Sequence, residues 1–155
     1  STMIIHIGGD HAAYELQRHL VAWLTEQGHE VVDHGPLEYD AQDDYPVFVL
    51  PTAQAVAADP DSRGIVLGGS GNGEQMAANK VAGVRAALAW QPELAALARQ
   101  HNDARVVSIG ARFTDTATAE AIVEAFLTTE FEGEERHARR VAMVEAYERD
   151  GSLPG

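Results

Sequence analysis

The sequence predicts an α/β fold: a single Rossmann-like domain, a three-layer sandwich with a five-stranded parallel sheet between helices and an extra C-terminal helix. Three observations lead to this prediction. Five short apolar runs alternate strictly with helical segments along the 155 residues. No linker and no repeat of solenoid length divides them. The chain is 45% apolar, and it is long enough for one core but too short for two.

The first part of the chain is predicted as strand, helix, strand. Residues 3–7 are a β-branched apolar run that ends in two glycines, which is typical of a buried strand. Asp10 is a favourable N-cap for the helix expected at 12–27, where apolar residues recur at helical spacing until Gly28. The sequence Glu-Val-Val-Asp at 30–33 indicates the second strand.

The middle part begins with a turn-rich stretch, 35–44. An alanine- and valine-rich helix is expected at 45–58, with a kink or a restart at Pro51, because proline lacks the N–H that a helix needs. Gly-Ile-Val-Leu at 64–67 indicates the third strand. A glycine-rich turn and a short helix at 74–79 follow it.

The last part continues the alternation. Strands are expected at 85–89 and 105–109, and helices at 92–100, 115–128 and 134–149. Strict alternation favours a parallel sheet with helices on both faces, and we expect the common strand order 2-1-3-4-5.

Composition restricts the class of protein. We expect one domain at 3–150, with Ser1-Thr2 left over from expression and 151–155 a flexible tail. The net charge of −13 should repel nucleic acid and anionic membranes. Without cysteine there is no disulfide, thiolate nucleophile or cysteine-bound metal. No apolar run reaches the roughly 18 residues of a membrane span, and no signal peptide opens the chain, so we expect a cytoplasmic protein.

Two glycine-rich turns are expected to meet at the ligand site. In parallel sheets ligands bind at the carboxyl ends of the strands, where the strand order reverses. In the expected order that point lies between the first and third strands. The turns that follow these strands, 8–11 and 68–74, are the most glycine-rich strand-to-helix turns in the sequence. Both therefore point to one crevice.

The second of these turns does not match the common nucleotide motifs. Glu74 and Gln75 stand where a Walker A loop has Lys and Ser or Thr, and Met76 fills the last glycine position of the dinucleotide pattern. The backbone amides of 71–74 instead form a donor set for an oxyanion or an enediolate. Glu74 is either a first-turn acid that complements the helix dipole or a general base, and burial would raise its pKa while the dipole would lower it.

Several motifs together resemble the sugar-phosphate isomerase family that includes the type B ribose-5-phosphate isomerases and the galactose- and allose-phosphate isomerases. They follow the family's order over almost the whole chain: Gly8-Gly9-Asp10-His11-Ala12, Asp43-Asp44-Tyr45-Pro46, Gly68-Gly69-Ser70-Gly71-Asn72-Gly73-Glu74-Gln75, Ala78-Asn79-Lys80, His101-Asn102-Asp103-Ala104, Gly110-Ala111-Arg112, and Arg136 with Arg140. Many members carry a cysteine at Ser70 as the base. This chain resembles the actinobacterial-type branch, in which the glutamate at Glu74 does that work.

The resemblance implies roles for individual residues. Glu74 would be the base, His101 the acid that opens the sugar ring, Asp10 a ligand of hydroxyl groups and His11 a neighbour of the phosphate. The other implied substrate-binding residues are Ser70, Gly71, Asn72, Gly73, Asn102, Arg112, Arg136 and Arg140. The residues alone favour the structural interpretation, with Asp10 as a helix N-cap and His11 as an exposed first-turn residue, and both interpretations can hold together.

His101 and Asn102 fall between a helix and the fifth strand, at the edge of the sheet opposite Glu74. One subunit cannot easily bring His101 to its own Glu74. If His101 is the ring-opening acid, a neighbouring subunit should supply it, which predicts a homodimer, or a tetramer built from dimers, with a shared site. The alternative is a polar helix C-cap.

Arg136 and Arg140 are four residues apart and therefore share one helix face. In a chain with only 11 basic residues, this cluster suits a phosphate, which paired guanidinium groups bind well. The alternative is a solvated charged face that offsets neighbouring glutamates. Arg112 is a third candidate cation, and Tyr45 lines either the pocket or a turn.

The expected activity is that of an aldose–ketose isomerase. By resemblance it interconverts D-ribose 5-phosphate and D-ribulose 5-phosphate through a cis-enediolate, without a cofactor. The seven histidines show no metal-ligand spacing, so no metal is expected either. One alternative is a six-carbon substrate such as allose or galactose 6-phosphate. Another is a non-enzymatic flavodoxin-like binding module, although the Ser- and Thr-rich phosphate loop of such modules is missing.

Overall fold

The computed structural model describes residues 2–155. Within them, one sheet holds five parallel strands: β1 (Ile4–Gly9), β2 (Glu30–Asp33), β3 (Arg63–Gly68), β4 (Ala86–Leu88) and β5 (Val106–Gly110). The α-helices are α1 (Tyr14–Glu26), α2 (Pro46–Ala58), α3 (Asn72–Ala78), α4 (Pro92–Asn102), α5 (Thr116–Thr128) and α6 (Glu135–Asp150). Two short 3-10 helices, η1 (His11–Ala13) and η2 (Ala111–Phe113), follow β1 and β5. The α/β fold predicted from the sequence is confirmed.

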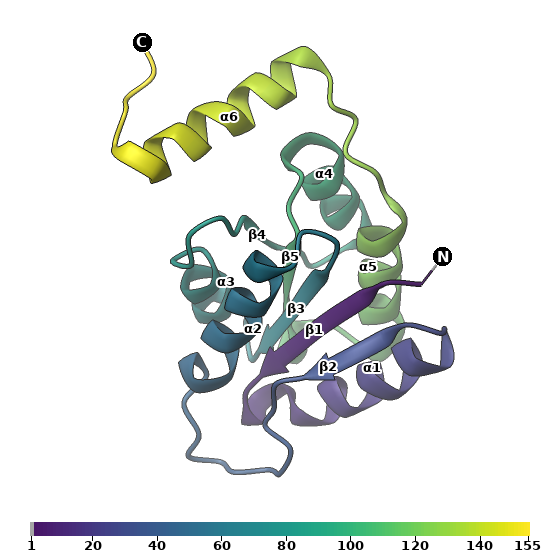
Figure 1. Cartoon of the computed structure of the whole chain (residues 1–155). Helices are drawn as coiled ribbons and strands as arrows, with labels where there is room; N and C mark the ends of the chain where they lie inside the picture. Colours follow the sequence, from purple (N-terminus) through teal and green to yellow (C-terminus); the bar gives the residue numbers. More distant parts are fainter. Residues whose placement is uncertain (1) are drawn as a thin grey trace.

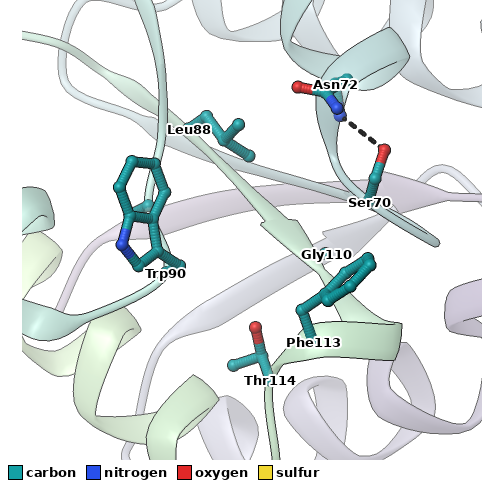
Figure 2. Close-up of a pocket in the computed structure, with 8 residues that line it drawn as sticks. Ser70, Asn72, Leu88, Trp90, Gly110, Phe113 and Thr114 are labelled. Carbon is teal, nitrogen blue, oxygen red and sulfur yellow. Dashed lines mark hydrogen bonds between the residues drawn. The ribbon is translucent and has the colours of Figure 1, made fainter.

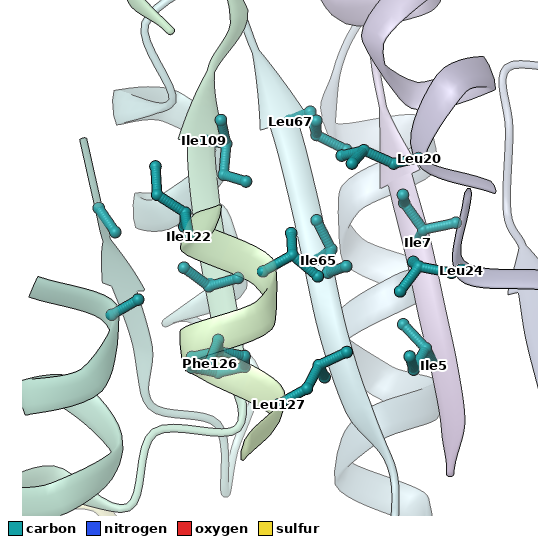
Figure 3. Close-up of a cluster of buried hydrophobic side chains, with 14 of the residues drawn as sticks. Ile5, Ile7, Leu20, Leu24, Ile65, Leu67, Ile109, Ile122, Phe126 and Leu127 are labelled. Atoms are coloured by element: carbon teal, nitrogen blue, oxygen red, sulfur yellow. The ribbon is translucent and has the colours of Figure 1, made fainter. Parts of the chain in front are cut away.

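The sheet has an apolar core on each face, because successive strand residues point to opposite sides. One core joins the strands to α1, α4 and α5, and Figure 3 shows the largest of its side chains: Ile5, Ile7, Leu20, Leu24, Ile65, Leu67, Ile109, Ile122, Phe126 and Leu127. The other core lies under α2 and α3 and includes Val49, Ala53, Val56, Val66, Ala78 and Val106. Helices thus cover both faces of the sheet (Figure 1).

The strand order is β2-β1-β3-β5-β4, so the expected order 2-1-3-4-5 is wrong in its last two positions. β5 is buried along its whole length and pairs with β3 on one side and β4 on the other. β4 has three residues, two of them partly exposed, and it forms the edge. Interior positions of a parallel sheet favour the strand that is apolar on both faces. The reversal between β1 and β3 is unchanged, so the expected ligand crevice keeps its place.

Two helices differ in detail from the prediction. α2 is continuous from Pro46 to Ala58, so Pro51 does not restart it. Its ring removes only one backbone hydrogen bond, from a helix that is anchored by the buried Val49, Thr52, Ala53 and Val56. α3 begins at Asn72, two residues earlier than expected, because Gly71 supplies a left-handed N-cap with φ of 84°. A residue with a Cβ is strained in that conformation.

α6 lies apart from the sheet, next to α4 (Figure 1). It runs along the amino-terminal side of the strands, where Glu148 accepts a hydrogen bond from the amide of Gly83 and Glu145 pairs with Arg85. Of its 16 residues, all within the described part of the chain, His137 alone is buried. No helix in residues 2–155 is long and apolar enough to cross a membrane.

Candidate active site

The turns after β1 and β3 meet in one pocket, as expected. The pocket has a volume of about 490 Å³ and lies at the carboxyl ends of β1, β3 and β5. It is lined by Asp10, His11, Ala12, Tyr45, Gly69, Ser70, Gly73, Glu74, Arg112 and Phe113. Six of the predicted site residues therefore line a common pocket, and Tyr45 lines it as well.

Glu74 is buried in the first turn of α3, with 4% of its surface exposed. Its carboxyl group fills the space where Gly68 has no side chain, and a Cβ at Gly68 would collide with all three carboxyl atoms. Gly73 has a similar role, because a Cβ there would lie 2.7 Å from the hydroxyl oxygen of Tyr45. The glycines of this turn are thus required by the close approach of neighbouring side chains, which a pattern of glycines alone does not reveal.

Burial raises the pKa of Glu74 above its ordinary value of 4.5, and the negative charge of Asp10 raises it further. Hydrogen bonds from the backbone amides of Glu74 and Gly71 lower this pKa and are weaker than the effect of burial. Of the two opposing effects on the pKa of Glu74 that the sequence left open, the effect of burial is therefore the larger. A carboxylate with a raised pKa is a stronger base, which suits removal of a proton from carbon.

The amides of the 71–74 turn are only partly free as oxyanion donors. The amide of Asn72 donates to Ser70 Oγ at 3.2 Å (Figure 2), and those of Gly71 and Glu74 face the Glu74 carboxylate. The amide of Gly73, in the first turn of α3, has no partner within the helix. An anion bound here would therefore compete with the carboxylate of Glu74 for the remaining donors.

Asp10 and His11 each combine a structural contact with a position in the pocket. One oxygen of Asp10 accepts a hydrogen bond from the amide of Ala12 at 3.0 Å, so Asp10 caps the short η1, whereas the expected long helix, α1, has Ala13 at its N-cap and no side-chain cap. The ring of His11 is held by Asp43, whose Oδ1 lies 2.7 Å from Nδ1. This hydrogen bond is the main cause of a raised pKa at His11. The contact with Asp43 was not predicted, because 32 residues separate the two in sequence.

Arg112 brings a cation to the pocket from η2. Its guanidinium lies over Gly69, where a Cβ would be 2.9 Å from Nη1, and its amide donates to the carbonyl of Gly69 at 3.0 Å. The turn after β3 also packs closely against the end of β5, since a Cβ at Gly110 would collide with the carbonyl of Ser70. The segments that follow β1, β3 and β5, which are neighbours in the sheet, thus each contribute a polar group to one pocket.

Four of the predicted site residues lie at the opposite edge of the sheet. His101 and Asn102 end α4, ahead of β5, and Arg136 and Arg140 lie on α6. Strands of five and six residues separate this edge from Glu74, which corresponds to roughly 17–20 Å. His101 stacks on His137, with ring centroids 4.2 Å apart and planes 6° from parallel. One chain therefore carries two separate groups of predicted residues.

Two clusters of the described residues bring metal-ligating atoms together, namely His101 with Glu132 and His137, and Asp10 with His11 and Asp43. An ion lies in the plane of each imidazole that binds it, and the parallel planes of His101 and His137 cannot both contain one ion. In the second cluster, Nδ1 of His11 is occupied by its hydrogen bond to Asp43. The first arrangement does not fit a metal as it stands, and in the second a metal at Nδ1 would have to replace this hydrogen bond.

A second, more apolar pocket of about 440 Å³ adjoins the first and shares Ser70 and Phe113 with it. Figure 2 shows its lining, with Leu88 and Trp90 on one side and Phe113 and Thr114 on the other. Trp90 and Phe113 are 58% and 76% exposed, which is unusual for large aromatic side chains. No motif in the sequence marks these two residues, although each follows a predicted strand.

The family profile described as Ribose/Galactose Isomerase matches residues 5–144. The chain belongs to this family. It is 52% identical over 154 residues to ribose-5-phosphate isomerase B of Mycobacterium tuberculosis (strain ATCC 25618 / H37Rv), with 99% of this chain and 95% of that protein covered. It is 40% identical over 144 residues to the Escherichia coli (strain K12) protein of the same name, covering 93% and 95%.

Solved structures agree with this family. Ribose-5-phosphate isomerase B from Mycoplasma genitalium with bound ribulose-5-phosphate superimposes with a TM-score of 0.92 at 41% identity, covering 97% of this chain and 98% of that one. The enzyme from Clostridium thermocellum gives a TM-score of 0.91 at 41% identity, covering 97% and 100%. The resemblance read from the motifs is confirmed, and with it the assignment to the isomerases.

Proposed function

We propose that this chain interconverts D-ribose 5-phosphate and D-ribulose 5-phosphate through a cis-enediolate. The observation that carries the proposal is the buried Glu74 at the turn after β3, within the crevice where the strand order reverses. The bound ribulose-5-phosphate of the Mycoplasma genitalium relative supports the choice of a five-carbon substrate. The 52% identity to ribose-5-phosphate isomerase B of Mycobacterium tuberculosis supports it further.

In the proposed reaction Glu74 removes the proton from C2 of the open-chain aldose. The electron pair of that C–H bond forms the C1–C2 double bond, and the electron pair of the carbonyl π bond moves to the oxygen at C1, which gives the cis-enediolate. The enediolate is held by the amides of Gly71, Gly73 and Glu74, two of which are released as the carboxylate turns toward the substrate. Glu74, now protonated, returns its proton to C1, the proton of the C2 hydroxyl passes to the oxygen at C1, and the oxygen at C2 becomes the ketone.

The ring must open before this step, because the furanose form of ribose 5-phosphate has no carbonyl. We assign ring opening to His101, with Asp10 and Asn102 holding sugar hydroxyls. Arg112, Arg136, Arg140 and His11 would surround the phosphate. These guanidinium and imidazole groups supply positive charge that an anionic substrate needs near a chain of net charge −13.

A second copy of the chain would bring the two groups of residues together. His101, Arg136 and Arg140 lie too far from Glu74 to act on one substrate within a single chain. The exposed Trp90 and Phe113 beside the Glu74 pocket are the kind of surface that a partner covers. We therefore propose a homodimer with two shared sites, on its own or as half of a tetramer.

A coupled assay with ribose 5-phosphate tests the reaction. Glu74→Gln is expected to lower kcat by about 10²–10⁴-fold and to leave KM nearly unchanged, since the phosphate ligands are untouched. The matched control is Glu93→Gln, which removes an exposed first-turn glutamate from α4 and should leave turnover intact. A Glu74→Gln enzyme with most of its turnover, or faster turnover of allose 6-phosphate by the wild type, would contradict the proposal.

Mixed dimers test the shared site. In a 1:1 mixture of unfolded Glu74→Gln and His101→Asn chains refolded together, half of the dimers contain one chain of each kind, and one of their two sites is intact. About a quarter of the wild-type activity should return. If each site were built within one chain, mixing would restore no activity. Light scattering then gives the mass of the assembly, against 16.7 kDa for one chain.

A further inference from the structure

Asp43 makes two contacts with His11 through a single oxygen. Its Oδ1 accepts the backbone amide of His11 at 3.1 Å and lies 2.7 Å from the ring nitrogen Nδ1. Asp43 comes from the loop between β2 and α2, whereas His11 begins the turn after β1. The two contacts fix both the position and the plane of the imidazole. Because Nδ1 is occupied, Nε2 is the ring nitrogen left for the pocket that His11 lines.

The surroundings of Asp43 favour a positively charged partner. Its side chain is 7% exposed, and within residues 2–155 its second oxygen, Oδ2, is buried without a hydrogen-bond partner. A buried carboxylate is destabilised unless a donor or a cation compensates its charge. The donors that reach it are the amide and the ring of His11, so a protonated ring is the compensation that the geometry offers.

Several charged or titratable groups face His11. Asp10 precedes it in the same turn, Asp43 bonds it from the loop, and Arg112 approaches from η2. The ring of Tyr39 meets it edge-on, with centroids 6.3 Å apart, and Tyr45 and Glu74 line the same pocket. The hydrogen bond to Asp43 raises the pKa of His11 most, burial and Arg112 lower it, and the charges of Asp10 and Asp43 raise it again.

We propose that Asp43 is a positioning residue that holds His11 as an imidazolium, so that its Nε2–H donates a charge-assisted hydrogen bond to the phosphate of the substrate. This inference rests on the proposed function, because a sugar phosphate is the ligand. The proposal gives the Asp43-Asp44-Tyr45-Pro46 segment a role in substrate binding. No side chain of this segment takes part in the proposed reaction itself. Asp43 does not touch the substrate and acts through His11.

The test is Asp43→Asn, measured as KM for ribose 5-phosphate across pH. At about pH 8 KM should rise about tenfold, since an amide cannot keep the imidazole charged. At about pH 5.5 an unassisted imidazole is protonated as well, so the increase should be small. kcat should change little at either pH. The matched control is Asp44→Asn, which removes the neighbouring, exposed carboxylate and should change neither constant.

NMR titration of the His11 ring separates this role from a merely structural one. In the wild type the ring should titrate above the ordinary pKa of histidine, and in Asp43→Asn it should titrate lower. In a His11→Gln background, Asp43→Asn should have no further effect on KM. An equal rise in KM at both pH values, or a wild-type ring that titrates normally, would overturn the proposal, and the wild-type measurement holds even if Asp43→Asn does not fold.

Binding of inorganic phosphate distinguishes this proposal from the proposed function. If the wild type does not turn over ribose 5-phosphate, yet the His11 titration shifts and Asp43→Asn weakens phosphate binding at about pH 8, the proposed function fails and the positioning role stands. If turnover is normal and the titration does not shift, the positioning role fails alone.

Discussion

Gly68→Ala should inactivate the enzyme without replacing any group that takes part in the reaction. A Cβ at Gly68 would overlap the carboxyl carbon and both carboxyl oxygens of Glu74. Ordinary contacts between heavy atoms lie at about 3.5–4 Å, so the carboxyl group must retreat by about 1 Å or more. The backbone at Gly68 is not in the left-handed region, so alanine adds no strain in φ.

The expected loss follows from that displacement. A misplacement of about 1 Å in a reacting group can lower the rate by about 100-fold, and overpacking costs about 1–3 kcal/mol of stability. We therefore expect kcat to fall about 100-fold, with a smaller change in KM, because the substitution removes none of the proposed phosphate ligands. The assay is turnover of ribose 5-phosphate, together with a melting curve that shows the variant is folded.

A second variant separates this steric effect from general damage. Once Glu74 has been replaced by Gln, adding Gly68→Ala should cause little further loss of turnover, since the base is already absent. A folded Gly68→Ala enzyme that kept more than half of its turnover would show that the carboxyl group need not occupy the position seen in the structure. A loss that multiplied fully with that of Glu74→Gln would contradict the reasoning as well.

Three further predictions concern protons, and one concerns metal. Because burial and Asp10 raise the pKa of Glu74, the acid limb of kcat/KM should lie above the range of an ordinary glutamate, and Asp10→Asn should move it to lower pH. A raised folded-state pKa lowers stability as pH rises through it, so Glu74→Gln should raise Tm at about pH 8 and have little effect at about pH 4, as calorimetry can show. Burial and the neighbouring His34 lower the pKa of His6 below 6.5, so the unfolded chain binds more protons in acid. Urea titrations should therefore give a smaller unfolding free energy at about pH 5 than at about pH 7.5, and His6→Gln should reduce this difference. Dialysis against EDTA should leave turnover unchanged, and a loss that added metal restored would contradict the expectation of a metal-free enzyme.

Periodicity predicted the elements well because strand and helix patterns are local. Every predicted strand and helix is present, and the turn after β3 lies where the fold class requires it. The order of β4 and β5 could not be read in the same way. Both are short and apolar, and the choice of the interior strand depends on which one is buried on both faces after packing.

The site was predictable where neighbours in sequence determine it. Asp10 caps the turn that directly follows it, and Glu74 directly follows the glycine-rich turn after β3. The contact between Asp43 and His11 depends on how a loop folds over β1, and the exposure of Trp90 and Phe113 depends on what packs beside them. Whether the pKa of Glu74 is raised or lowered depends on how deeply its side chain is buried, and composition does not contain that information.

The cysteine-free sequence gives the turn after β3 a chemical advantage. Here position 70 carries a hydroxyl group, and the carboxyl group of Glu74 fills the space beside Gly68. Neither group reacts with peroxide or alkylating agents as a thiolate does. Iodoacetamide and hydrogen peroxide would find no sulfur nucleophile in this pocket. Sugar interconversion by this chain should therefore continue under oxidative stress that silences a thiol-dependent counterpart.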